Sequence, residues 1–252
     1  MLRNVLLIAT TSGLTLFSKE FLNAISQPRM IGGLLTAMME SSVRTTGLPV
    51  TYIELSNVAV TIMKDEVVKV CCALFHDRSD GPAFGKLIAS QILCAFLEEY
   101  SGNLTSPGRN LKDFHGFHLK IAGAVRNSIR PVLNRLHGHH SRAIQKAMLV
   151  TEDAIVQTGS AVDELALLAN LQALLYLSSE LLAQRDDLCS QIVLEGSGDV
   201  RTLLWRIEHA VFIVVVNKSV RPTHYRAALN EAAKMLGQVC FVMSNNHLIW
   251  RG

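Results

Sequence analysis

The chain has 252 residues, of which 49% are hydrophobic and 18% are charged, and its formal net charge is +3. This length suits one large domain or two of ordinary size, and the apolar content excludes a disordered chain. We find no run of 18 nearly uninterrupted apolar residues, so the sequence predicts no membrane span. The five cysteines are odd in number and contain no CxxC pair, which favours a reduced, cytoplasmic protein.

The first hundred residues alternate between strand-like and helix-like periodicity. Their apolar spacing predicts two strands, a helix, three strands and a second helix. Gly47 follows the first helix as a stop signal, and Pro82 opens the second helix. The predicted elements are Asn4–Thr10, Leu14–Ser18, Arg29–Thr45, Pro49–Leu55, Val58–Met63, Val67–Phe75 and Pro82–Tyr100.

A basic stretch from Arg109 to Lys146 separates this half from the next, with eight Lys or Arg residues and one acid. Apolar residues from Phe114 to Leu136 recur every three or four positions, which predicts a helix with a kink or a junction at Pro131. The opposite face carries Lys112, Lys120, Arg126, Arg130 and Arg135.

Three kinds of partner compete for this basic face: an acidic protein, an anionic membrane and nucleic acid. Nucleic acid is disfavoured, because Phe114 and Phe117 lie on the apolar stripe and are not interleaved with the basic residues. An ordinary solvated face is the fourth interpretation, and the sequence alone does not choose between it and a binding surface.

After the basic stretch, the same order of two strands, a helix, three strands and a helix returns. This is a repeat of architecture and not of residue identity. The predicted elements are Lys146–Val150, Ala154–Gly159, Asp163–Ala183, Cys189–Glu195, Val200–Ile207, Val211–Val216 and Pro222–Val239. We therefore expect an α/β protein of two modules, each a five-stranded, mostly antiparallel sheet flanked by helices.

Residues 1–103 resemble a longin domain in the opening NVLLIATTSGLTLF, the helix from Ile31 to Val43, the three-strand meander and the helix after Pro82. Residues 110–246 resemble a roadblock/dynein-light-chain domain: a leading helix precedes the same order, and KAMLVTEDAIVQTGS resembles that family's first hairpin. Residues 104–109 would be the linker. The two families are close relatives, so by pattern each half also fits the other family.

The resemblance implies a non-catalytic scaffold or adaptor, cytoplasmic or peripheral on endomembranes, in vesicle trafficking or small-GTPase regulation. Its implied partners are a small GTPase and other longin or roadblock subunits, in a homodimer or a heterodimer. Longin domains hold partners in a groove, which here would use Met30, Leu34 and Met38 on the first helix with Tyr52 on the edge strand. A plain core helix is the alternative for this methionine stripe.

Catalytic, cofactor and metal sites are not predicted. No GxxxxGK[ST] motif is present to cradle phosphate. His137, His139 and His140 lack a nearby Cys or carboxylate ligand, so we interpret them as a solvated loop. Cys71 and Cys72 precede His76, but buried structural thiols are commoner than nucleophiles in such a strand. A profilin-like module that senses a small molecule is the alternative function.

Overall fold

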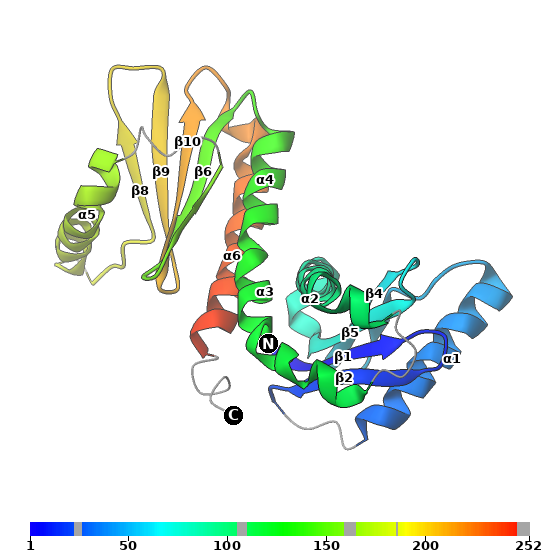
Figure 1. Cartoon of the computed structure of the whole chain (residues 1–252). Helices are drawn as coiled ribbons and strands as arrows, with labels where there is room; N and C mark the ends of the chain where they lie inside the picture. The colour runs from blue at the N-terminus through cyan, green and yellow to red at the C-terminus, as the bar shows by residue number, and fades with distance from the viewer. Residues whose placement is uncertain (23–26, 105–109, 159–164, 185, 246–252) are drawn as a thin grey trace. The chain divides into compact units, whose positions relative to one another are not determined.

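The computed structural model describes residues 1–22, 27–104, 110–158, 165–184 and 186–245. They form two compact units, Met1–Ser128 and Ile129–Ser244. Each unit is a five-stranded antiparallel sheet flanked by helices (Figure 1), which confirms the predicted fold class. The sequence placed the second domain at 110–246 after a linker at 104–109, whereas the structure groups residues 110–128 with the first unit.

The first unit follows the predicted order of elements closely. Its sheet has the strand order β2-β1-β5-β4-β3. Helix α1 ends where predicted: Gly47 adopts a left-handed φ of 73° and its N–H donates to the carbonyl of Val43. The elements are β1 (Leu2–Ala9), β2 (Leu14–Glu20), α1 (Pro28–Thr46), β3 (Tyr52–Glu54), β4 (Val58–Asp65), β5 (Val70–Asp77) and α2 (Gly81–Leu104), with a short 3-10 turn η1 (Arg78–Asp80) before α2.

The two helices of this unit cover opposite faces of its sheet. On one face, Leu35 and Met39 of α1 pack with Leu6 and Ile8 of β1 and with Ile62 of β4. On the other face, α2 contacts β4 and β5 along its buried side chains. Helix α2 is apolar because it packs on the sheet as part of the core. Its side chains that are essentially inaccessible to solvent are Phe84, Ile88, Ile92 and Phe96.

Strand β3 is shorter than the predicted Pro49–Leu55 and spans only Tyr52–Glu54. One backbone hydrogen bond extends the pairing just before β3: the N–H of Ile62 donates to the carbonyl of Thr51, at 2.9 Å. Two residues further along, Lys64 would face Pro49, which has no N–H to donate. The pairing therefore stops, and the end of β4 is left without a strand neighbour on this side.

The predicted basic helix is divided into three pieces. A 3-10 segment η2 (Leu111–Leu119) is followed by α3 (Ile121–Asn127) and α4 (Ile129–His139). Asn110 and Asp113 form a capping box at the start of η2. The junction between α3 and α4 falls at Ser128, and Pro131 then lies in the first turn of α4, where a helix does not need its missing N–H.

The second unit repeats the topology of the first, with the strand order β7-β6-β10-β9-β8. One face of its sheet is covered by α5, whose Leu171 is buried with Met148, Leu204 and Ile213. The elements are β6 (Ile144–Val150), β7 (Ile155–Gln157), α5 (Leu165–Ala183), β8 (Gln191–Glu195), β9 (Val200–Ile207), β10 (Ala210–Asn217), η4 (Pro222–His224) and α6 (Arg226–Asn245). Part of the strand predicted at Ala154–Gly159 and the start of the helix predicted from Asp163 lie outside the described residues.

Candidate functional site

The methionine stripe of α1 lies on the surface of the first unit. Met30 is 69% exposed, Leu34 59% and Met38 40%, so none of the three is an ordinary core residue. Tyr52 is placed elsewhere: its ring lies 6.3 Å from that of His76, on the face of the sheet covered by α2. The structure thus brings three of the four predicted groove residues together and separates the fourth from them.

A cavity of about 600 Å³ lies beside the shortened strand β3. Met39, Val43 and Ile62 give it apolar walls, and Tyr52 also lines it. Its charged lining residues are Glu40, Arg44, Lys64, Glu66 and Lys86, and Lys64 is already paired with Glu66 at 3.0 Å. Pro49, Val50 and Thr51, which precede the first residue of β3, also line the cavity.

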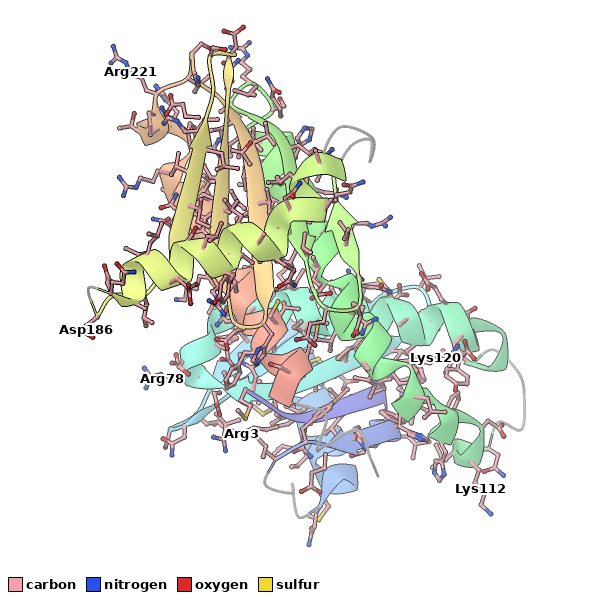
Figure 2. The ribbon with its side chains drawn as sticks, turned by 90° about the vertical axis from the view of Figure 1, so that its left-hand side faces the viewer. Arg3, Arg78, Lys112, Lys120, Asp186 and Arg221 are labelled. Atoms are coloured by element: carbon pink, nitrogen blue, oxygen red, sulfur yellow. The ribbon has the colours of Figure 1, made fainter. Side chains whose placement is uncertain are left out.

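The predicted basic face is divided between the two units. Lys112, Lys120 and Arg126 belong to the first unit, and Arg130 and Arg135 belong to the second. Lys120 is 3.2 Å from Glu99 of α2, so part of its charge is neutralised within the unit. Lys112 projects into solvent from the start of η2 (Figure 2). All five side chains are exposed, three on the first unit and two on the second.

Helix α5 exposes several large apolar side chains on the second unit. Glu180 is the single charged residue among its 19. Tyr176 is 62% exposed, Leu177 59% and Leu181 66%, and the small residues Ala169 and Ala173 are also exposed. Asn170, Gln172 and Glu180 are exposed on the same helix, so the outer side of α5 is a mixed surface with an apolar patch.

Strand β8 is the outermost strand beside this helix. Ile192 and Leu194 point towards the α5 core cluster, while Val193 is half exposed. In the sheet, β8 pairs with β9 on one side only. We call the exposed side of α5 (Ala169, Ala173, Tyr176, Leu177 and Leu181), together with the outer edge of β8, the α5–β8 surface.

Two of the other three sheet edges are protected by neighbouring elements. Segment η2 contacts β2, and helix α4 contacts β7. Strand β3, at the third edge, is only three residues long. Short or covered edges are the usual protection against unwanted strand pairing, and β8 has five residues in the strand with an apolar pattern. Among the described strands, β8 is therefore the edge best suited to pair with another chain.

A buried polar pair in the first unit has the geometry of an activated hydroxyl. Thr61 Oγ1 lies 2.9 Å from His76 Nε2, and Asp80 Oδ2 lies 3.9 Å from His76 Nδ1. However, Thr61 is only 2% exposed and His76 is fully buried. A nucleophile must reach its substrate, so this burial favours a structural role for the pair over covalent catalysis.

The cysteines considered as nucleophiles are buried as well. Burial raises the pKa of Cys71 to about 12 and that of Cys72 further still, and burial raises the pKa of Cys240 to about 11. Only the thiolate is a strong nucleophile, and these shifts suppress it at neutral pH. The suggested partnership of His76 with these thiols is not formed, because its ring nitrogens bond to Thr61 and to the Asp77 carbonyl.

The histidines around the basic stretch do not converge. His118 Nδ1 lies 2.6 Å from the carbonyl oxygen of His115, within one turn of η2. Among the residues that the structure describes, no group of three or more His, Cys, Asp or Glu side chains is placed to hold a metal ion.

One described helix is long and apolar enough to cross a membrane: α5, over Ala166–Ala183. No span was predicted from the sequence because Asn170, Gln172 and Glu180 interrupt this apolar run, whereas the length and composition of the helix are sufficient for one. The helix lies across one face of the second sheet in Figures 1 and 2, with Leu171 in the core. This placement makes α5 a structural part of the unit.

Comparisons with known proteins add little to this description. No family model and no curated protein matches the chain. Among solved structures, the chain is similar to Myxococcus xanthus MglB with 14% identity and a TM-score of 0.39, over 44% of this chain and 93% of that one. A likeness at this level carries no argument about function.

The sequence did not identify the α5–β8 surface as a site. The available signal was a single charge in 19 residues, and the sequence predicted a helix there without assigning its faces. Periodicity separates a buried face from a solvated one by their polarity, and the exposed side of α5 carries leucine, alanine and tyrosine among its polar residues. Only the packing shows that the helix has a single covered side.

Proposed function

We propose that the chain is a non-catalytic adaptor that pairs, through the α5–β8 surface, with a second domain of the same longin or roadblock kind. The observation that carries this proposal is the joint exposure of an apolar helix and an open strand edge on one unit. Pairing at a strand edge satisfies backbone donors and acceptors, while the helix buries its apolar side chains. The partner is another chain or a second copy of this one.

A protein fits this surface better than an anionic membrane does. The sequence flanking α5 contains Asp163 and Glu164 before the helix and Arg185, Asp186 and Asp187 after it. Peripheral membrane helices carry lysine and arginine on their polar face, whereas α5 carries none. The exposed Ala169 and Ala173 also allow a second helix to approach closely.

The finer part of the proposal is that the paired domains hold or regulate a small GTPase in membrane trafficking, in the cytoplasm or peripherally on endomembranes. It rests on the resemblance of the two halves to longin and roadblock domains. The α1 stripe of Met30, Leu34 and Met38 is the second exposed apolar surface available for such a partner. The basic residues Lys112, Arg130 and Arg135 remain candidates for an acidic partner or for lipid headgroups.

The pairing is tested by the molar mass of the purified chain in solution across a range of concentrations. We expect a species heavier than the monomer, or a complex with a supplied longin or roadblock partner, and Leu177→Glu should abolish it. Val67→Glu is the matched control, because Val67 is 90% exposed and belongs to the first unit, whereas the α5–β8 surface belongs to the second. Loss of pairing in both variants, or in neither, contradicts the assignment of the α5–β8 surface.

The GTPase part has its own test. Affinity purification from the native cell, at low and at moderate salt, should recover a small GTPase, and the purified pair should bind it directly. A monodisperse chain that pairs with nothing and recovers no GTPase would contradict the adaptor proposal. Pairing without a GTPase would contradict only its finer part.

The alternative function, a small-molecule sensor, is favoured by the cavity beside β3. Its apolar walls and its charged Arg44, Lys64 and Lys86 match the mixture of apolar and polar lining that ligand pockets use. A thermal shift with a panel of small anions and metabolites, lost in Met39→Trp, would support the sensor. No shift with any compound leaves the adaptor as the better account.

A further inference from the structure

We propose that His76 is an acid-sensitive latch that fastens helix α2 to the sheet of the first unit. This inference is independent of the partner that the chain binds. It starts from the two hydrogen bonds of the imidazole. Nδ1 lies 2.9 Å from the carbonyl oxygen of Asp77, and Nε2 lies 2.9 Å from Thr61 Oγ1.

These two partners fix the protonation state of the ring. A carbonyl oxygen only accepts, so Nδ1 carries the proton and donates it to Asp77. Nε2 is then the unprotonated nitrogen, and it accepts from the hydroxyl of Thr61. The side chain of His76 is 0% exposed, so both bonds are formed away from solvent. The packed unit therefore contains the neutral imidazole in one defined tautomer.

A second proton cannot be accommodated without breaking this arrangement. It would be placed on Nε2, facing the Thr61 hydroxyl, which would have to turn and give up its donation. Burial lowers the pKa of His76, and this effect outweighs the opposing influence of the Asp77 carbonyl and of Asp80. An imidazolium ion here would also be buried, where a charge is costly unless it is paired.

The nearby carboxylates are already engaged with other cations. Asp80 Oδ2 is 3.9 Å from Nδ1, but it forms an ion pair with the N-terminal ammonium of Met1. Asp77 is bound by Arg3 at 2.7 Å and by the same ammonium at 3.2 Å. The ring also contacts Tyr52, Phe84 and Thr61, none of which carries a charge at neutral pH.

Helix α2 packs directly on this pair of side chains at Gly85. A Cβ atom at this position would lie 2.4 Å from His76 Nε2 and 2.1 Å from Thr61 Oγ1. At this point the backbone of α2 leaves no room for a water molecule between Gly85 and the two side chains. Protonation of His76 must therefore push the start of α2 away from β4 and β5 or unfold the unit.

The direction of the pH effect follows from the lowered pKa. The unfolded chain, with an ordinary histidine pKa of about 6.5, takes up the proton first as the pH falls. The stability that neutral His76 provides is therefore complete above about pH 6.5 and is lost as the pH falls below it. The loss of unfolding free energy reaches its full size once the pH is below the pKa of His76 in the folded protein.

The second unit provides an internal control. Strand registers pair Leu2 with His76 in the first sheet and Ile144 with Val216 in the second, so Val216 occupies the equivalent position. Valine does not titrate. Acid should therefore loosen α2 and β5 in the first unit while β10 and α6 of the second unit stay protected.

Hydrogen exchange of the full chain between pH 7.5 and 5.0, corrected for the intrinsic rate, tests the latch. We expect peptides covering Phe84–Ile88 to exchange about tenfold faster at the lower pH, and those covering β10 not to change. His76→Gln should remove this pH dependence, and His139→Gln, at an exposed position of α4, should retain it. The same acid response in His76→Gln, or an equal response in both units, overturns the proposal.

A direct titration keeps the test decisive if His76→Gln fails to fold. The His76 ring carbon signals in the NMR spectrum of the unmodified chain report the protonation of this side chain alone. We expect a midpoint well below 6.5, accompanied by broadening of α2 amide signals. A midpoint at or above 6.5 would show that the folded unit accepts the imidazolium, and the latch would be ruled out.

Discussion

The ring of Phe17 on β2 meets the ring of Phe117 on η2 edge to face, with centroids 5.3 Å apart and an angle of 87° between the planes. Phe117 also contacts Phe96 and Tyr100 of α2, and Phe114 contacts the same two rings, at centroid distances of 5.1 to 6.1 Å. Both phenylalanines of η2 are fully buried. The segment after the predicted linker is therefore part of the first core.

This cluster predicts where the first unit can be separated from the chain. A fragment ending at Ser128 should fold cooperatively, whereas one ending at Leu104 should not, because it exposes Phe17, Phe96 and Tyr100 and uncovers the edge of β2. In the full chain, Phe117→Ala should cost about 3–5 kcal/mol in the first unit. Circular dichroism and denaturant unfolding of the two fragments give the measurement. A stable, soluble 1–104 fragment would contradict the assignment of η2 to this unit.

A single methyl group at Gly85 should destabilise the first unit. The added Cβ would overlap Thr61 Oγ1 and His76 Nε2, and neither atom can move freely, since the threonine is β-branched and the histidine is held by two hydrogen bonds. We expect Gly85→Ala to reduce the free energy of unfolding by about 1–3 kcal/mol. Chemical denaturation followed by far-ultraviolet circular dichroism measures this change.

Gly123 of α3 is the matched control for that substitution. It is also a helical glycine, but it is exposed and a Cβ there would meet no atom within 4 Å. Gly123→Ala should therefore leave the unit unchanged or stabilise it by up to about 1 kcal/mol, as alanine is the better helix former. If both substitutions had the same effect, helix propensity would explain the result and the close approach of α2 would not.

The order of elements could be predicted because it depends on local patterns. Alternation identified the strands, Gly47 ended α1, and Val200–Ile207 was predicted with the bounds that the structure has. The prediction of one basic helix was wrong in detail. Phe114 and Phe117 continue the helical stripe of Val132 and Leu136 in the sequence, but the two pairs are buried in different units. Periodicity indicates which side of a segment is buried and does not indicate which sheet covers it.

The candidate sites were less predictable for a similar reason. Met30, Leu34 and Met38 share a helix face by spacing alone, so their common location followed from the sequence. Tyr52 was grouped with them because β3 was expected to run from Pro49, and its side chain instead faces His76. The His76–Thr61 pair joins residues 15 apart in two strands, and only the strand register brings them together.

Thiol labelling of the native chain is the last prediction. Cys94 is exposed on α2 and Cys189 is partly exposed, whereas Cys71, Cys72 and Cys240 are buried. A maleimide at pH 7 should therefore label Cys94 rapidly, and Cys94→Ser should remove that rapid phase. The buried thiols, whose pKa values are raised by burial, should react only as fast as the protein unfolds.

The same experiment distinguishes an adaptor from a thiol enzyme. Adding denaturant should bring the three slow cysteines to the rate of Cys94, because exposure and an ordinary pKa return together. If Cys71 or Cys72 reacted in the native state faster than Cys94, one of them would have to be an accessible thiolate. That outcome would contradict the burial of β5 and would replace the non-catalytic proposal with a nucleophilic one.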